Sequence, residues 1–352
     1  MSMLRSVKNS LLRTKGFGLS PALAQSKWRS RRLLILCYHG VAMGDEHASH
    51  PEMFIPAADF ERRLEILKSF GANVLALGEA VRRLKEGTLP PRSVSITFDD
   101  GWADFYVKAY PALRKYGFPA TVYQTTYYCF YNRPIYLFSL RHMMWSRRDT
   151  IVAGHKIPFL PEVLDLRTEE ARSMVMTRIW DEMRSREYSG KQRDDFAAEF
   201  AATIGFDYLD ITRGRLFHLM NPEEVAAISA GGIDVQLHTH RHRTPVDRDL
   251  FLQEIEENRR YLSELTGKNH RVHFCYPCGA NQPAFLPWLG EAGVVSATTC
   301  DHAIASSSDN PLLLPRLLDQ SGISDDAFEA WLSGFMAFMP QRTVPRLEVA
   351  PE

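Results

Sequence analysis

The chain has 352 residues, of which 45% are hydrophobic and 24% are charged. This composition is typical of a soluble globular protein with a substantial core, and it excludes a disordered or collagen-like chain. The formal net charge is +0, but residues 1–32 contain eight of the 42 basic residues and none of the 42 acidic ones. The rest of the chain is therefore acidic by eight charges, so we expect no general binding of nucleic acid.

The basic segment 1–32 has the pattern of an interfacial helix. Leu4, Val7 and Leu11 fall on one face of a possible helix over residues 2–15, and basic residues flank this face. Such a helix binds anionic lipid surfaces, so we expect peripheral contact of residues 1–32 with the inner face of a membrane. Packing of the segment on the barrel floor, or a disordered basic tail, are the alternatives.

The sequence has no apolar run of about 18 residues that could span a membrane. The N-terminus also lacks the apolar stretch of about 7 to 15 residues that marks a secretion signal. We therefore expect a cytoplasmic location, with the membrane contact of residues 1–32 as a peripheral one.

Strand and helix patterns alternate over the first third of the chain. Residues 33–36 form a short apolar run, followed by a helical pattern that ends near Gly71, a strand at 73–77 and a helix around 80–84. Residues 94–98 alternate in polarity, and a helix ending at Gly117 and a strand at 120–123 follow. This alternation predicts a parallel sheet or barrel.

The alternation of strands and helices stops at about residues 129–217, which we interpret as a helical insertion containing one helix that begins at Thr168. It resumes with a helix after Asn221, a strand at 233–237, a helix at 249–265 and a strand at 272–276. The predicted organisation is a barrel over 33–335, with the segment 1–32 before it and a tail at 336–352.

Polar clusters follow three of these strands. They are Asp99-Asp100, His238-Thr-His-Arg-His242 and Tyr276-Pro-Cys-Gly279. Barrels place active sites at the carboxyl ends of their strands, and two histidines four apart with a carboxylate form a metal site open to water. Taken singly, the histidines could lie in a solvated loop and Asp-Asp-Gly could be an ordinary turn.

The five cysteines are odd in number and lie mostly in apolar stretches, so we expect reduced thiols. Cys275 and Cys278 have the spacing of a redox pair, but a proline-containing turn after a strand gives the same spacing.

The ordered motifs resemble those of a known family. Thr97-Phe-Asp-Asp-Gly101, His238-Thr-x-x-His242 and Tyr276-Pro-x-Gly279 resemble the polysaccharide deacetylase family, also called the NodB-homology or carbohydrate esterase family 4 fold. Tyr38-His-Gly-Val41 further resembles the circularly permuted branch that includes the deacetylases of poly-N-acetylglucosamine. The resemblance covers roughly residues 33–128 and 218–320 and implies an α/β fold, a distorted (β/α) barrel with a helical insertion.

The resemblance also implies a role for each motif residue. Asp100, His238 and His242 would bind a divalent metal, usually zinc, and Asp99 would be the general base. His39 would be the general acid that protonates the leaving amine, a role suited to a histidine near its ordinary pKa. The turn with Tyr276 and Cys278 would contact the substrate, and the Cys278 N–H would stabilise the oxyanion.

This sequence departs from the family at the third motif. Many members have an arginine there that orients the catalytic aspartate, whereas Cys275 and Cys278 occupy the matching positions. Arg316 resembles a later family position and is our candidate to reach Asp99 from another strand, with a surface arginine as the alternative. His240 is a second candidate ligand, although the family spacing favours the outer histidines. A buried structural histidine is the alternative for His39.

The expected function is removal of N-acetyl groups from an N-acetylated sugar, polysaccharide or glycolipid precursor. An O-acetyl esterase would need the same groups and is the first alternative. A carbohydrate-binding protein without catalysis, or a scaffold acting through the insertion, are alternatives of another class. Asp99 beside Asp100 argues against the binding protein, because binding a metal and a sugar requires no base. The scaffold would show partner binding that does not depend on metal.

Overall fold

The computed structural model describes residues 19–154 and 156–339. Its centre is a curled, mostly parallel sheet with the strand order β11-β10-β9-β6-β5-β1-β12, and β4 and β13 pair with β5 and β1. Two short pairs, β2 with β3 and β7 with β8, lie apart from it. The strands are β1 (Arg32–Tyr38), β2 (Gly40–Ala42), β3 (Phe54–Pro56), β4 (Asn73–Val74), β5 (Ser93–Phe98), β6 (Thr121–Gln124), β7 (Ile151–Ala153), β8 (Val163–Asp165), β9 (Asp234–Leu237), β10 (His273–Cys275), β11 (Ser296–Thr298), β12 (Ala305–Ser306) and β13 (Leu317–Leu318).

The two edges of the sheet approach one another through the segment before β13. Leu314 forms a parallel bridge with Thr298 at the end of β11, and three residues later β13 pairs with Leu36 and Cys37 of β1. The sheet therefore curls into the distorted (β/α) barrel that the sequence predicts. Arg316 lies in the segment that passes from β11 to β1.

The central strands are buried on both faces. In β1, Leu34 and Leu36 belong to the large core beneath the outer helices, while Leu33 and Ile35 pack with α6 on the inner face. Such two-sided burial is typical of parallel strands covered by crossover helices, and it explains the continuous apolar run in the sequence.

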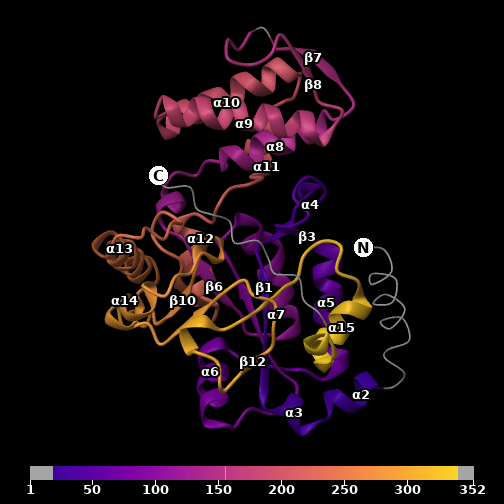
Figure 1. Cartoon of the computed structure of the whole chain (residues 1–352), viewed down its shortest axis with the longest axis vertical. Helices are drawn as coiled ribbons and strands as arrows, with labels where there is room; N and C mark the ends of the chain where they lie inside the picture. Colours follow the sequence, from indigo (N-terminus) through magenta and orange to yellow (C-terminus); the bar gives the residue numbers. More distant parts are fainter. Residues whose placement is uncertain (1–18, 155, 340–352) are drawn as a thin grey trace.

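Helices surround this sheet (Figure 1). The helices outside residues 129–217 are α2 (Leu19–Ala24), α3 (Lys27–Ser30), α4 (Glu46–Ser49), α5 (Ala57–Phe70), α6 (Leu77–Glu86), η2 (Phe105–Ala109), α7 (Tyr110–Tyr116), α12 (Pro222–Ala230), α13 (Arg248–Thr266), η4 (Pro277–Gly279), α14 (Phe285–Glu291), η5 (Pro311–Leu313), α15 (Asp325–Ser333) and η6 (Phe335–Phe338).

Between β6 and β9 the chain builds a separate lobe, which stands above the barrel in Figure 1. A second hydrophobic core lies within it, formed largely by its helices, and Phe54 and Trp102 of the barrel join that core at the junction. The lobe contains β7, β8 and the helices η3 (Tyr127–Phe130), α8 (Tyr136–Ser146), α9 (Glu169–Ser185), α10 (Gly190–Ile204) and α11 (Leu209–Gly214).

Two predicted helices begin at the capping residues that the sequence indicates. Thr168 accepts a hydrogen bond from the Ala171 N–H at the start of α9, and Asn221 forms a capping box with Glu224 at the start of α12. The strand predicted at 73–77 is shorter, because only Asn73 and Val74 pair with β5 before α6 begins.

The predicted membrane helix at 2–15 lies outside the described residues, so membrane contact stays a prediction. In the described part of that segment, α2 packs against α15. Arg29 is fully buried and donates hydrogen bonds to the carbonyl oxygens of Leu332, Arg32 and Ser93. Its charge is therefore not available to a lipid surface. Within residues 19–154 and 156–339, no helix is both long and apolar enough to cross a bilayer.

Candidate active site

Several residues at the carboxyl edge of the sheet have left-handed backbone conformations. Asp100, Thr239, His242 and Cys278 have φ values of 69°, 62°, 58° and 55°. Residues other than glycine rarely adopt this region, and such conformations persist where the surrounding structure enforces them, often at functional sites. All four lie in the three polar motifs that follow β5, β9 and β10.

Asp100, His238 and His242 converge on one point. The Asp100 Oδ1 lies 3.1 Å from the Nε2 of His238 and 3.1 Å from the Nε2 of His242. Trp102 donates a hydrogen bond of 2.9 Å to the other oxygen, Oδ2. Burial would raise the pKa of Asp100, but His242 and hydrogen bonds from both histidines hold it well below its usual range. Asp100 is therefore charged at neutral pH.

These three residues fit a divalent cation. The Nδ1 of His238 lies 2.9 Å from the backbone oxygen of Cys275, and because that oxygen only accepts, Nδ1 must carry a proton. The Nε2 therefore donates to Asp100 when the ring is protonated, and in the neutral ring it offers its lone pair to a cation, as in metal sites where a second shell fixes the histidine tautomer. The three ligand atoms lie within 4.8 Å of one another, in a two-histidine, one-carboxylate set suited to zinc.

Asp99 is held by a buried guanidinium. Arg316 donates hydrogen bonds of 2.7 Å to each carboxylate oxygen, and its Nε donates to the Thr299 oxygen at 2.9 Å. Burial raises the pKa of Asp99, but the charge of Arg316 and its hydrogen bonds outweigh burial and leave the pKa at about 2. Arg316, the residue before β13, thus reaches the carboxylate as expected of it.

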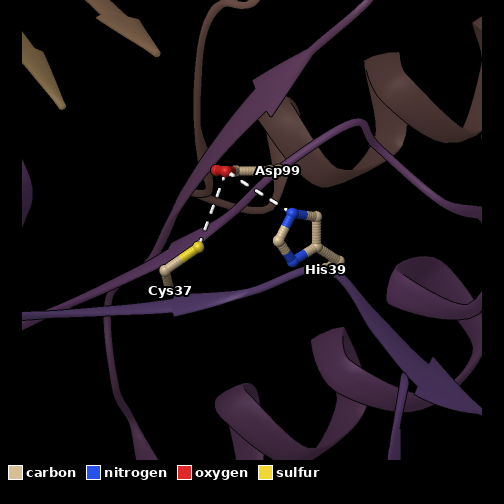
Figure 2. A group of neighbouring side chains, drawn as sticks. All are labelled: Cys37, His39 and Asp99. Carbon is tan, nitrogen blue, oxygen red and sulfur yellow. Dashed lines mark hydrogen bonds and ion pairs between the residues drawn. The ribbon is translucent and has the colours of Figure 1, made fainter. Parts of the chain in front are cut away.

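His39 and two thiols complete the surroundings of Asp99. The His39 Nε2 lies 3.9 Å from the Asp99 Oδ2, and the Cys37 Sγ lies 3.5 Å from the same oxygen (Figure 2). Cys275 approaches Oδ2 from β10 at 3.3 Å. The His39 side chain is 16% exposed, so part of it remains accessible to solvent.

In the third motif, the side chain of Tyr276 is not placed to contact a substrate. The Tyr276 side chain is fully buried and its hydroxyl donates a 2.9 Å hydrogen bond to the Leu312 oxygen. The phenol therefore faces the core and is not available to a substrate. Cys278 is exposed and lies at the turn after β10, so its backbone remains the candidate contact from this motif.

His240, the alternative ligand, points elsewhere. Its Nδ1 lies 2.8 Å from the Thr126 hydroxyl, and its ring stacks on Tyr261 with centroids 4.9 Å apart. The outer pair, His238 and His242, is therefore the pair that faces Asp100.

A sequence profile described as polysaccharide deacetylase matches residues 86–157 and 201–297. Over these two ranges the chain belongs to the polysaccharide deacetylase family. The match leaves out residues 158–200, which include α9 and most of α10. The curated relatives include a poly-β-1,6-N-acetyl-D-glucosamine N-deacetylase of Staphylococcus aureus, which is 24% identical over 276 residues, or 78% of this chain and 69% of the relative.

Solved structures show that the chain has the fold of polysaccharide deacetylases. The Streptococcus pyogenes deacetylase PplD matches with a TM-score of 0.55 and 19% identity, over 84% of this chain and 96% of PplD. IcaB from Ammonifex degensii matches with a TM-score of 0.53 and 19% identity, over 86% of this chain and 97% of IcaB.

Two residues of α13 hold the loop of residues 238–242, which we call the histidine loop. Sequence analysis did not find them. Asn258 of α13 accepts a hydrogen bond from the His238 N–H and donates to the Gln124 oxygen. One turn earlier, the Glu254 carboxylate accepts from the Arg241 N–H and from the side chain of Arg243. The available signal was that both polar residues lie on the buried, apolar face of a long helix.

Proposed function

We propose that this protein is a metal-dependent hydrolase that removes N-acetyl groups from an N-acetylated polysaccharide or its precursor. The main support is the convergence of Asp100, His238 and His242 beside a second carboxylate, Asp99, which is clamped by Arg316. A binding protein would need no such separate carboxylate. The choice of an N-acetyl substrate rests on the name of the Staphylococcus aureus relative.

In this proposal Asp100, His238 and His242 hold the cation, with zinc as the expected metal. A bound divalent cation lowers the pKa of a coordinated water and polarises the acetyl carbonyl. The residues of the chain supply the rest of the site. The Cys275 oxygen fixes the tautomer of His238, and Trp102 orients Asp100 through its indole N–H.

Asp99 accepts the proton of the attacking water. Its pKa of about 2 keeps it ionised at neutral pH, and the two hydrogen bonds from Arg316 fix the plane of the carboxylate. Arg316 is thus a positioning residue. His39, whose Nε2 lies 3.9 Å from the Asp99 Oδ2, is the proton donor to the departing amine. The Cys278 backbone is the candidate donor to the oxyanion.

The test is acetate release from N-acetylated oligosaccharides by protein stripped of metal and then titrated with zinc. We expect activity to rise to a maximum at one equivalent. His238→Ala and His242→Ala should lose both metal and activity, because each removes one of three ligands. Asp99→Asn should keep the metal and lose turnover. Full activity of the demonstrably metal-free protein would contradict the proposal.

A further inference from the structure

A cavity of about 390 Å³ lies at the neck between the barrel and the lobe. It is lined by residues 132–134, where the chain enters the lobe, by α10 and α11, and by Arg215 and His218, where the chain returns. The two passes are joined by a hydrogen bond of 2.8 Å from the Ile135 N–H to the Phe217 oxygen. We call this space the neck cavity.

The neck cavity is lined by polar atoms that the protein leaves without partners. The Tyr208 hydroxyl and the Arg215 Nε are buried and have no hydrogen-bond partner. His218 is 4% exposed, and its Nδ1 donates to the Leu216 oxygen at 3.0 Å, which leaves Nε2 as an acceptor. Buried polar groups nearly always have partners, so these groups indicate a polar ligand.

The charges around the neck cavity are paired within the protein. Arg133 bonds Asp194, Lys191 bonds Asp195 at 2.6 Å, and Arg215 bonds Glu224 with both terminal nitrogens. Burial raises the pKa of Tyr208 to about 12, so its hydroxyl remains a donor at neutral pH. An anion or cation would have to compete with these ion pairs, whereas a neutral molecule with several hydroxyl or amide groups would not.

One wall of the neck cavity is hydrogen-bonded to the loop that carries the catalytic aspartates. The His218 oxygen accepts from the Ala103 N–H at 2.8 Å, and the Met220 N–H donates to the Gly101 oxygen at 2.8 Å. The cavity wall and the loop of Asp100 are therefore neighbours, which is the arrangement that a distal subsite for a chain-like ligand requires.

We propose that the neck cavity is a distal subsite that binds a neutral sugar unit of the same glycan, through Tyr208, His218 and Arg215. This inference rests on the proposed function. Its volume lies within the range of small-molecule sites, and its hydrogen-bonding groups suit sugar hydroxyls and an acetamide. The lobe then extends the substrate-binding surface, and it favours long chains over short ones.

The experiment compares β-1,6-linked N-acetylglucosamine oligosaccharides of two and six units as substrates. Tyr208→Phe removes only the hydroxyl, and it should raise KM for the hexasaccharide about threefold to tenfold, the scale of one neutral hydrogen bond. Ala198→Trp, which fills the cavity from the surface of α10, should raise it further. Disaccharide kinetics should change less than twofold, because a short substrate does not reach the neck.

The matched control is Tyr188→Phe, which removes a hydroxyl of the lobe that does not line the cavity. It should leave both substrates unchanged. Equal effects of Tyr208→Phe on both chain lengths, or none on either, would overturn the subsite while leaving the deacetylase intact. If no oligosaccharide is deacetylated, the proposed function fails. Calorimetric titration with the hexasaccharide then still tests the subsite, since loss of binding in Ala198→Trp supports it and unchanged binding overturns it.

Discussion

Asp99 is ionised in a fully buried position because Arg316 compensates its charge. Both oxygens accept from the guanidinium, and the thiols of Cys37 and Cys275 fill the remaining space around Oδ2. Taking two charges out of water is costly, so such a pair is maintained only with near-ideal geometry. Removing one partner would leave the other charged and without compensation.

We therefore expect Arg316→Met to lower the free energy of unfolding by about 3 to 5 kcal/mol, the usual cost of breaking a buried pair. Arg316→Lys should recover part of this loss but not the activity, because an ammonium group cannot bond both oxygens in one plane. Chemical denaturation and acetate release measure the two effects. The control is Arg62→Met, whose exposed pair with Asp325 should contribute far less to stability because water screens it. Equal costs for Arg62 and Arg316 would contradict this account.

The role of His39 can be tested by its substitution. If it protonates the leaving amine, His39→Ala should lower the rate on an amide substrate by about 100-fold with no change in metal content. An acetyl ester has a better leaving group and should lose less. Stopped assays on matched amide and ester substrates check this, and equal losses on both would indicate a structural role.

At the level of single residues, sequence analysis found the groups that follow strands directly. Asp99, Asp100, His238 and His242 could be placed because each lies at the end of a buried strand. The contact of Arg316 with Asp99 was expected only from the family resemblance, because local periodicity does not determine how the sheet closes. Tyr276 was assigned to the substrate because of its motif, and only the packed core shows that its phenol turns inward.

The helix α13 shows how one element supports the site. Its buried face carries Phe251, Ile255 and Leu262, which anchor it on the sheet, and Glu254 and Asn258 on the same face bond the histidine loop. The loop backbone, left-handed at Thr239 and His242, is thus tied to a rigid helix. Contacts of this kind, one step removed from a metal, hold its ligands in the orientation that binding requires.

Asn258→Ala should weaken this support. The His238 N–H, the Gln124 oxygen and the Thr126 hydroxyl would each lose a buried partner, at about 1 to 3 kcal/mol for the most costly of them. Zinc affinity should fall about tenfold or more. The matched control is Gln253→Ala, on the exposed side of the same helix, which should change stability by less than about 0.5 kcal/mol. Unchanged zinc affinity in Asn258→Ala would contradict this role.

The elements that sequence analysis found best are those with caps and regular periodicity. The helix after Thr168, the helix after Asn221 and the helix ending at Gly267 all have local signals at their ends. The pair β7 and β8 carried no such signal, since it has three residues in each strand and part of it faces solvent. Elements this short depend on the fold around them, not on their own sequence.

At the scale of the whole molecule, a histidine pair joins the barrel to the lobe. The Ser49 hydroxyl lies 2.8 Å from the Nδ1 of His50 and 2.9 Å from the Nδ1 of His142, which belongs to α8. His50 also stacks on Phe138 of the lobe, with centroids 4.9 Å apart. Burial, and to a smaller extent Arg141, lowers the pKa of His50 from 6.5 to about 3, and burial also lowers that of His142.

This junction should make the protein less stable in mild acid. Between pH 6.5 and 3 the unfolded chain binds a proton at His50 that the folded chain does not, so stability falls as pH decreases. At pH 5 the loss from His50 is about 2 kcal/mol. Melting temperatures measured from pH 7.5 to 5 should show it, and His50→Gln should flatten the curve. An identical pH dependence in both proteins would exclude the junction as its cause.

The closure of the sheet through Leu314 and β13 has a consequence for the order of folding. Asp99 and Arg316 are 217 residues apart in the chain, so their contact is among the last that synthesis makes available. Non-local contacts of this kind form late, after the local elements that they join. A nascent chain that has emerged only as far as β11 therefore carries every expected metal ligand but an uncompensated aspartate. The charge of Asp99 is compensated only after the segment that contains Arg316 has been made.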